Sequence, residues 1–325
     1  MKLKNHPFIF LTSLVVLVII SFIFALLTGS GDLSSQEIFS LLNGTASPLH
    51  QSLVFDLRLP RALAAFAAGA LLSIAGVLMQ VLLRNPLADP YVLGVSGGSA
   101  LAALLAMLLG VNTFWLTGSA FLGALLSIFL VFSFAHSRGS WTIPRLLLTG
   151  IILASGWGAL ISFVLVISPP EKIHGMLFWL MGDLSYDRPL LPSYLILLFG
   201  FLLTISISRQ LNILLWGDLQ AGSLGIDTKR LRVSIFFISS LLTAGAITLA
   251  GSIGFVGLVI PHLVRLIIGT DHRLLVPASA LMGGALLIIA DTLARTMIAP
   301  QQLPVGVLTA LIGVPLFLYL LRRSQ

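Results

Sequence analysis

Cysteine is absent from the 325-residue sequence, which excludes disulfide bonds and thiolate metal sites. Charged residues are scarce as well: they make up 9% of the chain, against about 25% in an average soluble domain. So few charges cannot cover a water-facing surface, while 58% of the residues are hydrophobic and the mean hydropathy is +1.08. We therefore expect lipid to be the solvent for most of the chain.

No motif for hydrolysing a nucleotide is present either. The pattern G-x-x-x-x-G-K-[ST] does not occur, and no lysine follows a glycine, so we expect no P-loop and no ATPase activity. The histidines show no i, i+4 pairing, so no metal site is expected. The apolar runs hold no paired carboxylates, which argues against an ion-coupled carrier. A membrane-embedded enzyme would need converging polar residues within these runs, and no such constellation is found.

Apolar runs of about 20 residues, the length that crosses a bilayer, recur along the chain. The first, from Phe8 to Leu27, is longer than the apolar core of a signal peptide, which has about 7–15 residues, so we expect it to be retained. We predict one all-α polytopic transmembrane domain over residues 1–325. Its ten spans are expected at about 8–27, 62–83, 91–109, 114–135, 146–168, 191–207, 233–250, 253–268, 274–293 and 304–321.

Positive charge is distributed unequally between the two sides of these spans. An even number of spans puts both termini on one side, which holds 13 of the 18 lysines and arginines. The other side holds Arg58, Arg61, Lys172, Arg188 and Arg295. Cytoplasmic loops carry the excess of basic residues, so we place both termini in the cytoplasm. The net charge of +7 thus reports topology, and no nucleic-acid partner is expected.

The clearest interruption of apolar character runs from Ser208 to Arg232, where basic residues cluster around Asp218 and Asp227. Leucines recur within it at roughly helical spacing and glycines punctuate them. We predict two short amphipathic helices at the cytoplasmic membrane surface, a surface that suits docking of a soluble partner. A basic loop that only fixes topology is the alternative, and these residues alone leave it open.

Glycine is abundant, with 30 residues, many of them inside the predicted spans. Small residues let helices approach closely in lipid, so most of these glycines are expected to serve tight packing. The segment Gly251–Gly257 (GSIGFVG) is different, because its glycine content predicts an irregular backbone. Irregular backbone at membrane depth is tolerated only inside protein or beside water, so we expect this span to line a path.

Four smaller features carry expectations of their own. Asp291 and Arg295 share a helical face and either pair with each other or face an external partner. Trp179 is expected at the headgroup boundary, in a short interfacial helix. His262 is expected to be hydrogen-bonded near the interface, since a proton relay would need acidic neighbours. A short helix is expected over Ser35–Leu42.

Four ordered signatures give the chain its likeness to a known family. They are Arg58-Leu-Pro-Arg61 with the later RNPLADPYVLGVSG from Arg84, the stretch Gly217–Gly225, GSIGFVGLVIPHLVR from Gly251 with Asp271-His-Arg273, and LPVGVLTALIGVP from Leu303. Together they resemble, essentially end to end, the permease subunits of type II ABC importers, the iron-siderophore, haem and cobalamin uptake family.

The resemblance implies ten spans with short cytoplasmic coupling helices. It implies as partners two ABC ATPase subunits, an external solute-binding protein and a second permease, identical or a paralogue, in a bacterial plasma (inner) membrane. ATP and magnesium would belong to the ATPases, so no cofactor is expected in this chain. Family frequency favours an iron chelate (siderophore) as cargo. Cobalamin or haem carried by the same kind of machine is the alternative, and an ion-coupled secondary transporter the remote one.

The resemblance also assigns residues to roles. Arg58, Arg61 and Arg295 match external positions that pair with acids of the binding protein, although Arg58 and Arg61 could instead be interfacial anchors beside Pro60. No catalytic residue or metal ligand is assigned. The ATPase-coupling residues would be Leu211, Leu214, Gly217, Asp218 (where the family usually has glutamate), Ala221, Leu224 and Gly225. The residues at the cytoplasmic mouth, where a gate is expected, would be Asn85, Leu87 and Thr142.

Overall fold

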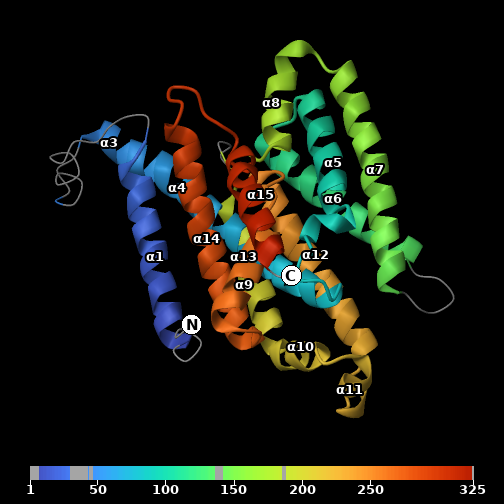
Figure 1. Cartoon of the computed structure of the whole chain (residues 1–325). Helices are drawn as coiled ribbons and strands as arrows, with labels where there is room; N and C mark the ends of the chain where they lie inside the picture. The colour runs from blue at the N-terminus through green and yellow to red at the C-terminus, as the bar shows by residue number, and fades with distance from the viewer. Residues whose placement is uncertain (1–6, 30–42, 44–46, 136–141, 185–187, 324–325) are drawn as a thin grey trace.

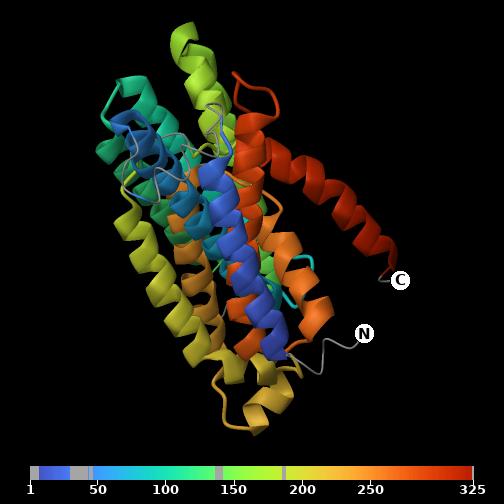
Figure 2. The same cartoon turned by 90° about the vertical axis from the view of Figure 1, so that its left-hand side faces the viewer.

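The computed structural model describes residues 7–29, 43, 47–135, 142–184 and 188–323. The secondary structure of these residues is entirely helical, which confirms the predicted all-α class. Figures 1 and 2 show a bundle with α8 (Pro170–Leu180) at one end and α10 (Ser208–Leu214) and α11 (Asp218–Ser223) at the other. We call these the α8 end and the α10–α11 end. The helix expected over Ser35–Leu42 lies outside the described residues.

A helix stands at each of the ten predicted spans. Within the described chain, six helical segments are long and apolar enough to cross a membrane: α1 (Pro7–Leu27), the continuous segment Pro48–Leu82, α6 (Thr113–Ala135), α7 (Ile143–Ile167), α12 (Thr228–Ala250) and α14 (His272–Thr296). A seventh consists of α9 (Leu190–Ser206) with α10, which follows at a bend of 56°. The remaining positions hold shorter apolar helices, α5 (Val95–Leu109), α13 (Val256–Ile268) and α15 (Val305–Arg323). Figure 2 shows α15 leaning away from the bundle.

The second span begins earlier than predicted. Instead of starting at residue 62, the helical segment runs through α3 (Pro48–Ser52), the π-helical turn η2 (Leu53–Arg58) and α4 (Leu59–Leu82). Pro60 has no N–H to continue an α-helical hydrogen-bond ladder, and the wider π-helical turn before it takes up this interruption. The chain around Arg58, predicted as the end of a loop, is therefore helical.

The third span begins later than predicted. It was expected from residue 91, but η3 (Pro90–Leu93) is a 3₁₀ turn and Gly94 is left-handed, with φ 70°. The helix α5 therefore starts at Val95. This turn lies against α7, because a methyl group on Gly150 would crowd the carbonyl oxygen of Val92.

The eighth span contains the predicted irregular backbone. It was expected from residue 253, but α13 starts at Val256, and both Gly251 (φ 69°) and Phe255 (φ 70°) have positive φ. Such a φ is uncommon for a residue other than glycine, so the break at Phe255 is imposed by its surroundings. The break is held by hydrogen bonds, since Ile253 N–H donates to Tyr91 Oη at 3.1 Å and Asp183 N–H donates to Ala250 O at 2.9 Å.

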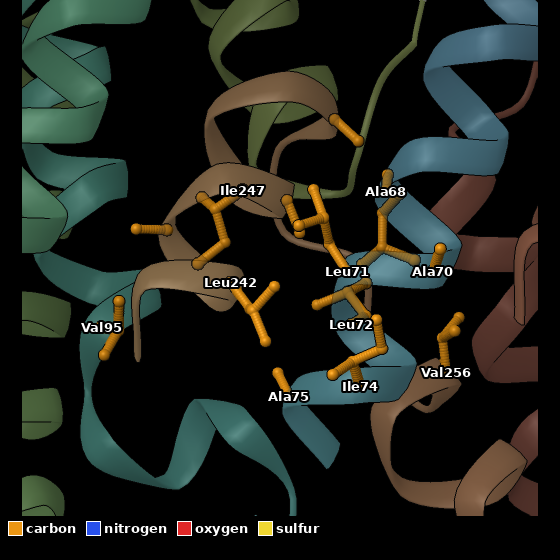
Figure 3. Close-up of a cluster of buried hydrophobic side chains, with 14 of the residues drawn as sticks. Ala68, Ala70, Leu71, Leu72, Ile74, Ala75, Val95, Leu242, Ile247 and Val256 are labelled. Carbon is orange, nitrogen blue, oxygen red and sulfur yellow. The ribbon is translucent and has the colours of Figure 1, made fainter. Parts of the chain in front are cut away.

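The helix α4 is the centre of the bundle. Every residue from Ala67 to Leu82 is buried, and α4 packs against α12, α13 and α14. Apolar residues cover all of its sides, the pattern of a helix surrounded by protein. Figure 3 shows Ala68, Leu71, Leu72 and Ile74 of α4 beside Leu242 and Ile247 of α12 and Val256 of α13.

Close helix contacts in this core depend on glycine. A methyl group on Gly69 would overlap the carbonyl oxygen of Gly283 in α14, and one on Gly76 would overlap that of Gly257 in α13. Small residues at these crossings let the backbones touch, which confirms tight packing as their role. Gly118, Gly156 and Gly158, predicted to pack in the same way, have open space around them in this chain.

One interfacial expectation is wrong, and a second stays a prediction. Trp179 is fully buried and its indole N–H finds no hydrogen-bond partner among the described residues, so it packs in the core and does not lie at a headgroup boundary. His262 Nδ1 is buried without a partner in the described chain, and the hydrogen bond expected for His262 stays a prediction for its other ring nitrogen. The burial of Trp179 follows from tertiary packing, which the local sequence pattern does not report.

Candidate functional site

The two short helices predicted between the sixth and seventh spans are present. Gly217 (φ 114°) separates α10 from α11, and Gly225 (φ 78°) follows α11. Positive φ of this kind favours glycine, so two of the predicted coupling residues form the corners of the segment. The next helix, α12, starts at Thr228 and not at the predicted residue 233, because Asp227 Oδ1 caps it by accepting from Arg230 N–H at 3.0 Å.

This segment has a buried and an exposed side, but large apolar side chains lie on both, which the predicted amphipathic pattern did not report. Leu211, Leu214 and Ala221 are buried and hold α10 and α11 against the bundle. Trp216, Leu219 and Leu224 are 69%, 89% and 59% exposed. Large apolar side chains gathered on one exposed turn mark a surface that another molecule covers. Leu224 alone among the apolar coupling residues belongs to that surface, while the others anchor it.

Asp218, the first residue of α11, lies between two arginines. Arg232 Nη2, from the first part of α12, donates to both carboxylate oxygens at 2.8 and 3.0 Å. Arg84, which follows α4, places its Nη2 2.6 Å from Oδ1. The carboxylate therefore joins α11 to two other elements at the α10–α11 end.

Asn212 joins α10 to the start of α14. Its Nδ2 donates to Asp271 Oδ1 at 2.7 Å, and its Oδ1 accepts from His272 N–H at 2.9 Å. Partial burial raises the pKa of Asp271, but the hydrogen bonds from Asn212 and from Arg273 N–H outweigh it and hold that pKa below its usual range. The carboxylate thus stays charged, and α10 is fixed to α14.

The expected gate residues fall into two groups. Asn85 is exposed and Leu87 half-buried in the turn after α4, where Leu87 N–H donates to Asn85 Oδ1 at 2.9 Å. Thr142 is exposed and precedes the first turn of α7. Among the described residues, no hydrogen bond or ion pair joins Thr142 to Asn85 or Leu87. The gate assignment stays a prediction.

Asp89 closes the same turn. Its Oδ1 accepts from Tyr91 N–H at 2.7 Å. Burial raises the pKa of Asp89 to about 6, against the opposing effect of this hydrogen bond. The turn therefore contains a carboxyl group that changes charge in the mildly acidic range.

A cavity of about 890 Å³ lies at the opposite, α8 end. Four arginines contribute to its walls, Arg58, Arg61, Arg188 and Arg295, together with the acid Asp56 and apolar side chains of η2, α8 and α9. The walls described for this cavity therefore hold more basic than acidic side chains. A negatively charged group entering it would meet several guanidinium groups at once.

The three predicted docking arginines are anchored within the chain. Arg58 Nη1 donates to Leu26 O at 2.8 Å, and Arg295 Nη2 donates to Ala25 O at 3.3 Å. Arg58 and Arg295 are 4% and 8% exposed, so they face the cavity rather than an outer surface.

Asp291 binds two of these cavity arginines. Arg61 binds it through Nε and Nη2 at 2.9 to 3.1 Å, and Arg295 Nε lies 3.4 Å from its Oδ2. Of the two readings of Asp291 and Arg295, the structure has them paired, with Arg61 as a third member. Docking of a binding protein at these arginines remains a prediction, and the cavity is where it would take place.

Several residues of these two regions were not assigned by sequence reasoning. Arg84 stood inside a recognised signature and Arg232 inside the basic cluster, but neither was assigned a role. Asn212 was read only as part of an amphipathic helix. Arg188 reaches the cavity because α9 starts beside α4, and no local spacing reports that contact. The one sequence signal for these contacts was Asp218, because an acid that lies among basic residues is expected to form ion pairs with some of them.

Comparison with known proteins places these features in a family. The FecCD transport family model matches residues 17–323. The chain is 42% identical over 278 residues to the cobalamin import system permease protein BtuC of Halobacterium salinarum, covering 85% of this chain and 74% of the relative. It is 36% identical over 332 residues to the hemin transport system permease protein HmuU of Yersinia pestis, covering 99% and 98%.

A solved structure has the same fold. It is described as an inward-facing conformation of a metal-chelate type ABC transporter, and it superposes with a TM-score of 0.85 at 34% identity, covering 97% of this chain and 99% of the other. The chain belongs to the FecCD transport family and is a multi-pass permease subunit of an ABC importer, not itself an ATPase.

Proposed function

We propose that this permease forms the translocation pathway for an iron chelate, delivered by an external solute-binding protein and driven by two partner ATPases. The observation that carries the proposal is the exposed apolar turn of α10 and α11, held by glycine corners and by Asp218. A transport chain without a P-loop needs a separate ATPase, and this surface gives that ATPase a place to bind. The cofactors ATP and magnesium bind to that ATPase and not to this chain.

In this arrangement the α10–α11 end faces the cytoplasm of a bacterial inner membrane, with both termini on that side. The distribution of 13 basic residues to that side and 5 to the other supports the orientation. In addition, α1 starts near the α10–α11 end (Figure 1). The ATPases then bind Trp216, Leu219 and Leu224 from the cytosol.

A second permease, identical or a paralogue, completes the pore. The helix α7 supports this partner, because Ile151, Ile152 and Phe163 are exposed and the glycines at 156 and 158 have open space. Small residues on an open face allow another helix to approach closely. Lipid covers the apolar surface that the second permease leaves.

The binding protein docks at the α8 end. Because Arg58 and Arg295 line a cavity, an acidic side chain of the binding protein reaches them by entering it. Hydrogen bonds to Leu26 O and Ala25 O position the two guanidinium groups at the cavity, where their positive charge attracts a carboxylate. Burial of such a pair fixes the orientation of the docked protein.

The cargo assignment rests on chemistry shared by two of the relatives, while a third, 35% identical to this chain, is named as the molybdate import system permease protein MolB of Haemophilus influenzae. Cobalamin and hemin are both metal ions held in large organic ligands, and the similar structure is described as metal-chelate type. An iron chelate such as a siderophore belongs to the same class. Cobalamin or haem is the second candidate cargo for the same pathway.

An ion-coupled secondary transporter is disfavoured. It would need a carboxylate near mid-membrane that binds the ion. Asp291 is the buried acid of α14, and it is already occupied by Arg61 and Arg295.

Reconstitution in proteoliposomes tests the proposal. We expect uptake of a radiolabelled ferric siderophore only when the cognate ATPase, ATP and the binding protein are all present. Hemin and cobalamin, supplied with the same components, test the alternative cargoes. Uptake by the permease alone under a proton or sodium gradient would refute the proposal.

A further inference from the structure

Asp218 binds two arginines, one from the helix that follows α11 in the chain and one from a region far away in the sequence. Arg232 belongs to α12, the helix that continues from the segment, so it keeps α11 attached to its own chain neighbour. Arg84 comes from the turn after α4, far away in the sequence. The ion pair between Arg84 Nη2 and Asp218 Oδ1, 2.6 Å long, therefore connects the exposed coupling surface to the central helix of the bundle.

The turn that Arg84 opens leads to the interior. Arg84 has a φ of 50°, so the chain reverses sharply there. Asn85 N–H donates to Gln80 O at 3.2 Å, and the Gln80 side chain donates to Leu258 O of α13 at 3.1 Å. Further along, Tyr91 Oη accepts from Ile253 N–H in the broken stretch before α13. Hydrogen bonds thus connect the chain on both sides of this turn to α13 and to the irregular backbone before it.

We propose that Arg84 is a positioning residue for transport, which ties the turn carrying Asn85 and Leu87 to α11 through Asp218. When a partner shifts α11, the ion pair makes the turn and the start of α13 follow. The proposal rests on the proposed function, since it needs a motor that moves α11.

The energetics of the pair suit this role. The side chains of Arg84 and Asp218 are 43% and 47% exposed, and ion pairs this exposed contribute little to the stability of a fold. Removing the pair should therefore leave the bundle intact and change only how the turn follows α11. The planar guanidinium also fixes direction in a way that an ammonium group does not.

The measurement is the amount of ferric siderophore imported per ATP hydrolysed, in proteoliposomes that hold the permease, its ATPase and its binding protein. For Arg84→Gln we expect this ratio to fall about fivefold or more, while ATP hydrolysis and ATPase retention persist. Arg84→Lys keeps the charge and should recover part of the ratio. Asp218→Asn, which also removes the ion pair with Arg232, should lower it at least as much, and the double variant should be no worse than Asp218→Asn alone.

Arg230→Gln is the matched control. Arg230 forms an ion pair of the same kind with Asp227, at 3.1 Å, but within one turn and 90% exposed. Its loss disturbs surface charge in the same segment without touching the turn after α4, so the ratio should stay within about twofold of the unaltered chain.

Three results would overturn the proposal. The first is an Arg84→Gln ratio equal to that of the control. The second is additive losses in the double variant, which would mean that the two residues act separately. The third is a loss of thermal stability large enough to explain the transport defect in Asp218→Asn as well as in Arg84→Gln. Failure of the proposed function is distinguishable, because the unaltered chain would then show no ATP-dependent uptake at all.

Discussion

Arg61 of α4 and Asp291 of α14 form a two-pronged ion pair, with Arg61 Nε and Nη2 both within 3.1 Å of the carboxylate. Asp291 is 2% exposed and lies 3.4 Å from Arg295 as well. One carboxylate therefore neutralises part of the charge of two cavity arginines. The pair links the central helix to its neighbour and at the same time shapes the mouth at the α8 end.

Asp291→Asn should destabilise the fold strongly. The amide keeps the shape of the side chain but leaves Arg61 and Arg295 without their shared counter-charge, and breaking a buried pair costs about 3–5 kcal/mol. Thermal unfolding of the detergent-solubilised protein measures this loss. Asp227→Asn is the control, because Asp227 is 53% exposed and asparagine caps a helix as well as aspartate does. An equal loss in both variants would contradict the account.

Gly76→Ala should disrupt the core. The added methyl group would overlap the carbonyl oxygen of Gly257, and backbone atoms on both helices leave nothing flexible to move aside. We expect a loss of at least about 2 kcal/mol in the free energy of unfolding. Gly118→Ala meets open space on α6 and should leave stability unchanged or slightly raised. The account fails here if both substitutions are tolerated equally.

The pKa of Asp89 predicts a pH dependence of stability. Burial raises this pKa from the model-compound value of 3.8 to about 6 in the folded state, so folding favours the protonated carboxyl. The contribution to stability is complete below about pH 4 and is lost as the pH rises to about 6. Asp89→Asn keeps the acceptor for Tyr91 N–H and removes this titration. Unfolding midpoints between pH 4 and pH 7 should therefore vary less in the variant, and an unchanged pH profile would show that Asp89 ionises normally.

Gly217→Ala should impair coupling without unfolding the bundle. At φ 114° an L-residue is strained, which costs on the order of 1–3 kcal/mol and is relieved by moving α11. Import per ATP should fall while the ATPase remains active. Gly222 lies within the same helix with open space around it and no positive φ, so Gly222→Ala should preserve import. Equal import by the two variants would show that the backbone conformation of Gly217 is not needed for coupling.

Much of this architecture follows from patterns that lipid enforces. Long uncharged runs predicted stretches at which the described chain is helical, and the glycines at 217, 225 and 251 are among its residues with positive φ. These features are local, so the local sequence reports them. Helix ends near Pro60 and Gly94 were misplaced because π-helical and 3₁₀ turns replace the expected α-helical starts.

What the sequence could not provide are contacts between distant segments. Arg84 meets Asp218, and Arg61 meets Asp291, only because α4 crosses the bundle between α12 and α14. Trp179 was placed at an interface by its residue type, whereas packing of α8 buries it. The predicted docking arginines face a cavity rather than the surface for the same reason.

The central claim, that a separate ATPase grips α10 and α11, is tested most directly by cross-linking from a single cysteine. The chain has none of its own, so Leu219→Cys introduces a unique thiol at a side chain that is 89% exposed. Labelled with a maleimide–benzophenone and irradiated in the assembled transporter, it should capture the ATPase subunit. Leu49→Cys, 72% exposed in α3 toward the opposite end, should not. Capture of the ATPase subunit by Leu49→Cys would contradict the account, and so would a failure of Leu219→Cys to capture it.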